Sequence, residues 1–241
     1  CRIGEEGVRA LVESKRLRQI THLDLSSNSI DTGGVETIAG AGQWDALTEL
    51  DLSSNQLGDD GAAALAGGDG LSGLEHLQIS YNDIGPTGAE ALTGWQQLSK
   101  LHSVDLSGNP LGDSGVAKFA DSEQSASLAS LDLSSVEMGD EGAESLAASK
   151  KLAGVTRLVL SRNELSDRGI EALATSPHIQ QLTELHLSRN QVTARGLEAL
   201  GNATFSSELT SLVLAENDIG QGAAEALAGF EDAKNLTRLN L

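Results

Sequence analysis

The sequence predicts an α/β solenoid, in which strand–helix units stack in a right-handed coil and curve into a horseshoe, with a parallel sheet on the concave face and helices on the convex face. Asparagines on one register mark a period of 27 residues, and each follows the pattern L-x-x-L-x-L-x-x-N or an aliphatic variant of it. A repeat of this length is typical of solenoids, whose units bury their apolar faces against their neighbours. The asparagine series is Asn28, Asn55, Asn82, Asn109, Asn163, Asn190 and Asn217.

The first element of each repeat is a short strand. In residues 49–53 polar and apolar side chains alternate, which predicts leucines facing inward and polar side chains facing out. Asn55 follows where the chain must turn, and its amide can donate to and accept from turn backbone groups. We therefore expect the stacked asparagines to form an internal hydrogen-bonded ladder.

The second element is a short helix. Residues 62–66 place Ala62, Leu65 and Ala66 on one helical face, and two glycines follow. Aspartates four positions after the asparagine register are expected to cap their own helices at the N-terminus, and a recurrent glycine six positions after it is expected to let helix and strand pack closely. The aspartates are Asp59, Asp113, Asp140 and Asp167, with Thr32 as a variant.

The curvature follows from the unequal widths of the two elements. Strands stack about 4.8 Å apart, whereas helices are about 10 Å wide, so the helical side must be longer. We assign residues 1–241 to one domain of eight full repeats with partial units at both ends, and expect it to be part of a longer chain. Val136 occupies an asparagine position with a side chain that cannot form hydrogen bonds, and Cys1 falls on the same register.

Composition limits the partners. A formal net charge of −19 argues against binding to nucleic acid or to anionic membranes, and is compatible with a basic protein partner. The single cysteine excludes an internal disulfide and favours a reducing, cytoplasmic compartment. We expect no cofactor and a monomer. Trp44 is expected in the core, and Trp95 and Phe230 at the surface, because their register otherwise holds small residues.

Residues 50–62 and 131–143 resemble ribonuclease-inhibitor-type leucine-rich repeats, and the resemblance extends over the whole chain. It implies protein binding through the concave face and the adjoining loops. Cysteine is a common alternative to the asparagine in that family, which suits Cys1. The uniform period and the helices rich in alanine and glycine favour a bacterial member.

Register arithmetic predicts which side chains stand on the concave face. Aspartates dominate the first half of the central row, whereas arginines and a histidine occur in the second half, so a partner could be oriented along the groove. The alternative is that these are solvated positions that drift between repeats. The candidate partner-binding residues are Asp24, Asp51, His76, Gln78, Tyr81, Asp105, Asp132, Arg157, Arg162, His186 and Arg189.

Catalytic and metal-binding patterns are weak. Residues 68–73 match G-x-G-x-x-G but follow a helix and precede a strand, the reverse of a dinucleotide site. His22, Asp24 and Ser26 share a strand face at a spacing of about 6.8 Å, too wide for a catalytic relay. The carboxylate pairs Asp24–Asp51 and Asp105–Asp132 offer few ligands for Ca²⁺, so we predict no metal site.

The sequence therefore predicts a non-enzymatic protein-interaction scaffold. One alternative is a regulator of an enzyme, such as a GTPase-activating protein, for which Arg168 and Arg195 are the candidate loop arginines. Another is a structural spacer between other domains.

Overall fold

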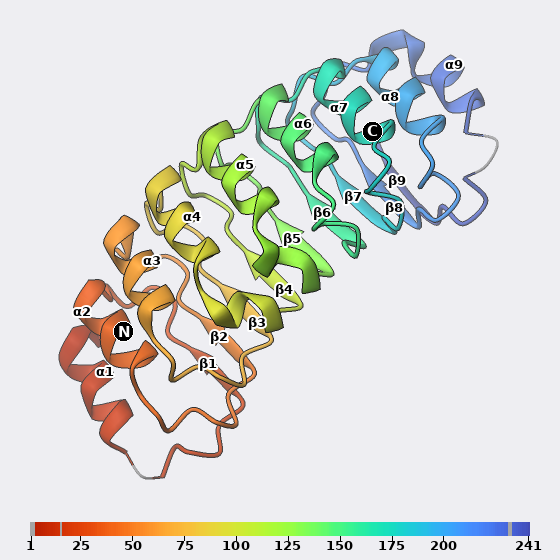
Figure 1. Cartoon of the computed structure of the whole chain (residues 1–241). Coiled ribbons are helices and arrows are strands. Elements are labelled where there is room, and N and C mark those ends of the chain that lie inside the picture. The colour runs from red at the N-terminus through yellow and green to blue at the C-terminus, as the bar shows by residue number, and fades with distance from the viewer. Residues whose placement is uncertain (1–2, 15, 231–232) are drawn as a thin grey trace.

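The computed structural model describes residues 3–14, 16–230 and 233–241, and shows a curved solenoid (Figure 1). Within these residues one parallel sheet contains nine strands in chain order. The strands are β1 (His22–Asp24), β2 (Glu49–Asp51), β3 (His76–Gln78), β4 (Ser103–Asp105), β5 (Ser130–Asp132), β6 (Arg157–Val159), β7 (Glu184–His186), β8 (Ser211–Val213) and β9 (Arg238–Asn240). The helices are α1 (Gly4–Glu13), α2 (Thr32–Ala39), α3 (Gly58–Gly67), α4 (Pro86–Thr93), α5 (Gly112–Asp121), α6 (Asp140–Ala148), α7 (Asp167–Ala174), α8 (Ala194–Gly201) and α9 (Ala223–Ala228). Three 3₁₀ helices are η1 (Gln96–Lys100), η2 (Glu123–Ser127) and η3 (Gly220–Gly222).

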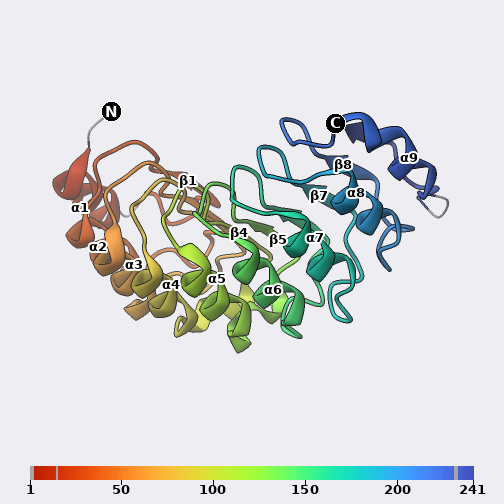
Figure 2. The ribbon, with the colours of Figure 1, turned by 90° about the horizontal axis from the view of Figure 1, so that it is seen from above.

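Every neighbouring pair of strands is parallel, and the register advances by one repeat at each step. Leu23 of β1 lies opposite Leu50 of β2, for example, and Leu50 lies opposite Leu77 of β3. The helices line the outer side of the arch and the sheet lines the inner side (Figure 2). The predicted fold class is confirmed.

A single aliphatic core runs between sheet and helices. The inward leucines of β2 to β8 are almost fully buried, as are Trp44 and Trp95 at 1% exposure each, whereas Leu23 and Leu239 on the end strands are not. The prediction for Trp44 is therefore confirmed, whereas the predicted exposure of Trp95 is wrong; Phe230 is partly buried. The register of Trp95 is interior, because a Cβ on Gly68 would lie 2.5 Å from the carbonyl oxygen of Ala39. Small residues mark close packing there.

The asparagines form the expected ladder along one edge of the core. Asn82, 1% exposed, accepts the N–H of Asn55 at 3.1 Å and donates to the carbonyl of Leu52 at 2.9 Å. Asn55 makes the equivalent bonds to the repeat before it, accepting from Asn28 and donating to Leu25. Each carboxamide thus ties its own turn to the turn of the preceding repeat, which leaves few turn amides unpaired inside the protein.

Val136 interrupts this ladder. It is fully buried, and its backbone N–H still donates to Asn163, but its side chain accepts nothing from the repeat before it. At the equivalent place Leu111 donates instead to the carbonyl of Asn109, two residues back in the chain. Such a tight turn suits the proline between them, whose ring fixes the local backbone angle. Cys1 lies outside the described residues.

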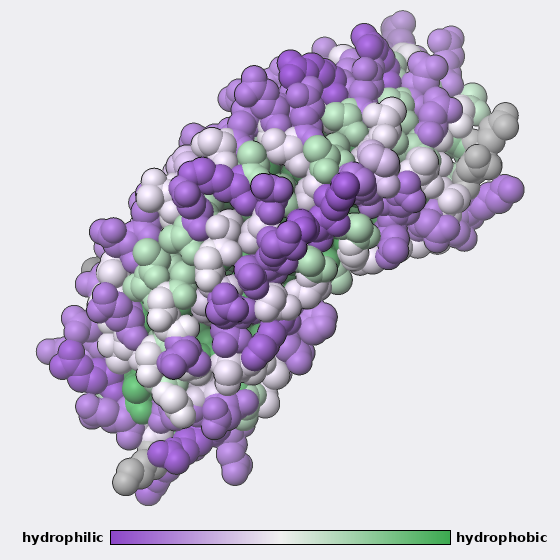
Figure 3. Space-filling model, in the orientation of Figure 1, coloured by the Kyte–Doolittle hydropathy of each residue, from purple (hydrophilic) through white to green (hydrophobic). Residues whose placement is uncertain are grey.

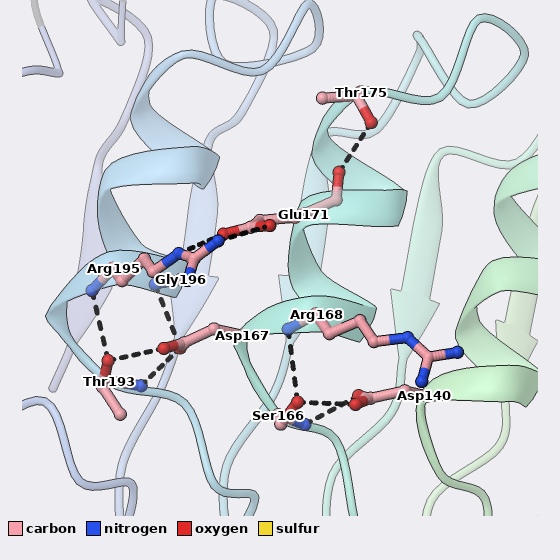
Figure 4. A network of polar contacts seen from close by, with 9 residues as sticks. All are labelled: Asp140, Ser166, Asp167, Arg168, Glu171, Thr175, Thr193, Arg195 and Gly196. Carbon is pink, nitrogen blue, oxygen red and sulfur yellow. Dashed lines mark hydrogen bonds and ion pairs between the residues drawn. The ribbon is translucent and has the colours of Figure 1, made fainter.

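The repeated aspartates cap helices, but they cap the next helix and not their own. Asp140 lies in the first turn of α6 and accepts the amide of Ser166 at 2.9 Å (Figure 4). It also accepts the amide of Gly169, at the start of α7, at 3.0 Å. Asp59, Asp113 and Asp167 do the same for α4, α6 and α8. The prediction of self-capping is therefore wrong. The carboxylates still meet the positive end of a helix dipole, now across the boundary between repeats.

This cap also explains the recurrent glycine in the repeats that follow a capping aspartate. A Cβ at Gly169 would lie 2.6 Å from the Oδ1 atom of Asp140, and a Cβ at Gly196 would lie 2.6 Å from that of Asp167. At these positions the glycine allows the carboxylate of the preceding helix to approach the backbone, and not a helix to approach a strand as expected. At Gly61 and Gly115 a Cβ would instead meet the Cβ of Leu57 or Leu111, at 2.8 and 3.1 Å.

Candidate protein-binding surface

Two rows of polar side chains stand on the concave face, carried by the first and third residues of each strand. The third-residue row contains Asp24, Asp51, Gln78, Asp105 and Asp132 on β1 to β5, and the parallel register places them side by side. It continues through Val159 and His186 on β6 and β7. The row predicted from the sequence is therefore contiguous on the sheet.

The four aspartates of this row share one orientation. In each, Oδ1 accepts the backbone N–H of the serine two residues later, at 2.8 to 2.9 Å. Asp24 also accepts from the hydroxyl of Ser26, and these two bonds lower its pKa. The spacing argument against a His22–Asp24–Ser26 relay is wrong for one pair, because the Ser26 hydroxyl donates to Asp24 at 2.7 Å. Nε2 of His22 faces Glu49 at 2.9 Å and not Asp24.

Asp105 has the opposite shift. Burial raises its pKa, and the negative charges of Asp132 and Asp51 add to that rise, although the hydrogen bonds from Ser107 oppose it. The middle of the row is therefore a place where negative charge is held at an energetic cost.

The second half of the face is more nearly neutral. The Arg157 Nε atom lies 3.2 Å from a carboxylate oxygen of Glu184 on the next strand. His186 is largely buried beside this pair, and burial together with Arg157 lowers its pKa, which favours the neutral imidazole. Its Nε2 atom lies 4.0 Å from Glu184, too far for a hydrogen bond.

Tyr81, Arg162 and Arg189 do not stand on the strands. They lie three residues past the strand ends, in turns where each has a positive φ between 53° and 59°. The Arg189 guanidinium pairs with Glu216 at 2.7 Å and lowers the pKa of that carboxyl. These three residues form the turn edge, a border beside the sheet.

Tyr81 is the most exposed large hydrophobic side chain in the described part of the chain, at 57%. Its ring covers Gly108, where a Cβ would lie 2.4 Å from the ring carbon Cδ1. The glycine therefore lets the Tyr81 ring pack closely against the next turn at the turn edge. Aromatic residues with this exposure are favoured at protein interfaces.

A shallow hollow of about 350 Å³ lies in the middle of the sheet. It extends from β2 to β6, and its lining includes His76, Gln78, Asp105, Asp132 and Arg157. Five of the predicted binding residues thus share one depression, whereas Asp24, Asp51, His186 and the turn edge do not line it.

The helical face is dominated by hydrophilic side chains, and hydrophobic ones form only narrow bands among them (Figure 3). Basic residues on one helix pair with glutamates on the preceding one. Arg168 lies 2.6 Å from Glu144. Arg195 lies 2.5 Å from Glu171, and Figure 4 shows this second pair. Both candidate regulatory arginines are therefore engaged within the solenoid.

A structural role that the sequence reading missed belongs to serines at the ends of helices. Ser122, Ser149 and Ser176 are buried, and each hydroxyl donates to a carbonyl of the preceding repeat. Ser149, for instance, donates to the carbonyl of Ala120 at the end of α5. Their spacing of 27 residues was the available signal.

Within the described ranges, no group of three or more His, Cys, Asp or Glu side chains is arranged to hold a metal ion. In the same ranges, no helix combines the length and apolarity needed to cross a bilayer.

The stacked parallel strands, buried asparagine ladder and outer helices define a leucine-rich repeat solenoid. A family model described as "Leucine Rich repeat" matches eight stretches, and the chain belongs to this family. The matched residues are 17–39, 47–66, 73–92, 97–120, 124–147, 155–174, 178–201 and 206–228. Proteins of this family generally serve as interaction scaffolds and are typically non-enzymatic.

Among solved structures, an internalin from Listeria monocytogenes is similar in fold, with a TM-score of 0.56 and 19% sequence identity. The similarity covers 97% of this chain and 70% of the internalin chain. At this level of identity it shows the fold alone. No curated protein matches the sequence.

Proposed function

We propose that the protein is a non-enzymatic scaffold that binds a protein partner across the concave face and the turn edge. The observation that carries this proposal is the charged row of the open sheet. Its aspartates are fixed in orientation by backbone amides and point away from the core, yet they form no ion pair with a basic side chain in the described structure. Tyr81 adds an exposed aromatic group beside them.

The helical face supports a different role. Its arginines and lysines pair with glutamates of adjacent helices, so their charges stabilise the stacking of repeats. This favours the scaffold over a GTPase-activating regulator, because Arg168 and Arg195 would have to leave Glu144 and Glu171 to reach a nucleotide.

Finer assignments belong to the same proposal. We infer a ribonuclease-inhibitor-like, bacterial member of the family from the 27-residue period and the helices rich in alanine and glycine. The single cysteine supports a cytoplasmic location. We also propose a monomer that binds neither nucleic acid nor membranes, which is supported by the net charge of −19.

Affinity capture from the native organism, followed by mass spectrometry, tests the scaffold. Three baits are compared: the natural protein, a variant with Gln78→Trp and Ser103→Trp on the concave face, and a matched variant with Thr175→Trp and Glu198→Trp on the helical face. The proposal predicts a partner that the first and third baits retain and the second loses. A partner retained equally by all three would contradict it.

A further inference from the structure

The acidic row is divided into two carboxylate pairs. Asp24 and Asp51 are direct neighbours on β1 and β2, and Asp105 and Asp132 are direct neighbours on β4 and β5. Gln78 on β3 separates them with a neutral amide. Because neighbouring strands are about 4.8 Å apart, the midpoints of the two pairs are separated by about 14 Å across the strands.

One oxygen of each carboxylate in these pairs is held and the other is not. The Oδ1 atoms are held by serine amides, which leaves the Oδ2 atom of each carboxylate without a hydrogen-bond donor in the described structure. Two carboxylates about 4.8 Å apart match the planar fork of one guanidinium group, or accept one ammonium group between them. The raised pKa of Asp105 supports this, because it reports burial and the repulsion of Asp132 and Asp51, both of which a cation would offset.

We propose that these pairs receive an extended segment of the protein partner that carries arginine or lysine at positions i and i+4 and runs across the strands. The proposal rests on the scaffold function proposed above and names the partner chemistry at the same face. In an extended chain, alternate residues face the same side at about 6.7 Å intervals, so positions i and i+4 are about 13 Å apart. That distance matches the separation of the two pairs.

The same geometry assigns the residue between the two cations. Position i+2 would lie opposite Gln78, at the middle of the row and at the edge of the hollow. A serine, threonine, asparagine or glutamine there could exchange hydrogen bonds with the Gln78 amide, whereas a third cation would meet no carboxylate. The predicted pattern is therefore cation, any residue, neutral polar residue, any residue, cation.

Fluorescence anisotropy with labelled peptides tests this inference. One peptide carries two arginines separated by three serine or threonine residues, and its isomers carry the same residues with the arginines adjacent or separated by one. At low salt we expect the i,i+4 peptide to bind at least about fivefold more tightly than either isomer, because only its arginines reach both pairs. Equal affinities for the three peptides would mean general attraction to an acidic protein and would overturn the proposal.

Two matched variants locate the binding. Asp51→Asn with Asp105→Asn removes one carboxylate from each pair while keeping an oxygen that can accept the serine amide. Glu36→Gln with Asp60→Asn removes the same charge from exposed positions on α2 and α3. The first variant should weaken binding of the i,i+4 peptide at least about fivefold, and the second less than about twofold. Equal weakening by both would contradict the assignment.

The pairs could instead hold Ca²⁺. A melting temperature that calcium raises in the natural protein but not in the Asp51→Asn and Asp105→Asn variant would assign them to a metal and overturn the inference. Binding of the captured partner to the two sets of variants distinguishes failure of this inference from failure of the scaffold proposal. If the partner is lost on Gln78→Trp and Ser103→Trp but is bound with full affinity by the asparagine variant, the scaffold stands and the cationic segment is wrong.

Discussion

The asparagine ladder makes a quantitative prediction about stability, because the chain contains its own natural deletion at Val136. We consider Asn82→Val, which places in the turn after β3 the residue that the turn after β5 already uses. The carboxamide of Asn82 accepts the amides of Asn55 and Leu57, and donates to Leu52 and Ser80. Valine is close in size, so the substitution removes these bonds without a large cavity.

The expected cost comes mainly from the two orphaned amides. A buried donor left without an acceptor costs about 1–3 kcal/mol, so the loss of two acceptors should lower the free energy of unfolding by about 2–6 kcal/mol. Leu52 keeps a second donor from Asn55, which limits the loss on the acceptor side. For a chain of this length the melting temperature should fall by at least about 4 °C.

The reciprocal substitution is Val136→Asn. A carboxamide there would offer an acceptor to Leu111, which now closes a tight turn onto Asn109, and a donor to the carbonyls of Leu106 and Leu133. We expect the free energy of unfolding to rise by about 1 kcal/mol, the net contribution of a typical buried hydrogen bond.

Urea denaturation followed by circular dichroism measures both variants, with the exposed Gln56→Val as the control, which should shift stability by less than about 0.5 kcal/mol. If Asn82→Val were no more destabilised than Gln56→Val, or if Val136→Asn cost as much as Asn82→Val, the ladder would not be a source of stability.

Three further predictions follow from the caps and charges. Asp140→Ala should lower the free energy of unfolding by about 1 kcal/mol, because α7 loses its cap. Gly169→Ala should destabilise the Asp140→Ala variant less than the natural protein, because the carboxylate that its Cβ would meet is gone. Purely additive costs in a double-mutant cycle measured by urea denaturation would contradict this. Because the pKa of Asp105 is raised by folding, its ionised carboxylate destabilises the folded protein at a pH above that pKa, and the effect disappears once the carboxyl is protonated at a pH below its ordinary pKa. Asp105→Asn should therefore be more stable than the natural protein at pH 7 and equally stable near pH 3. A gain in stability that persists unchanged at pH 3 would refute the stated cause. Arg195→Gln should lower the melting temperature slightly at low salt and not at all in 1 M NaCl, because the exposed pair with Glu171 is screened; the same loss at both salt concentrations would exclude an ion-pair effect.

Most of the architecture was predictable because it repeats. The inward leucines, the parallel register and the burial of the asparagines all follow from one period and one strand alternation. The aspartate caps show why a periodic sequence can still mislead about which helix a residue contacts. Asp140 begins α6 and also stands 29 residues before Gly169, and in a periodic sequence a contact within a repeat and a contact between repeats have the same signature. Only the three-dimensional structure distinguishes a contact within a repeat from a contact between repeats.

The surface was less predictable, because side-chain direction depends on backbone turns that the alternation rule ignores. The 27-residue register placed Tyr81 and Arg162, one residue before the asparagine position, among the concave rows, but the chain enters the left-handed region at these positions, three residues past the strand ends. The predicted exposure of Trp95 is wrong because the small residues at its register do not mark the surface. Small residues there are a response to a crowded interior, and the sequence gives no measure of crowding.

The central claim is that the partner lies against the concave sheet and not against the helices. Site-specific photo-cross-linking tests it most directly, with the cross-linking residue placed at Gln78 on β3 in one protein and at the exposed Glu198 on α8 in another. We predict a covalent adduct with the captured partner from position 78 and none from position 198. An adduct from position 198 alone would place the partner on the helical face and contradict the claim.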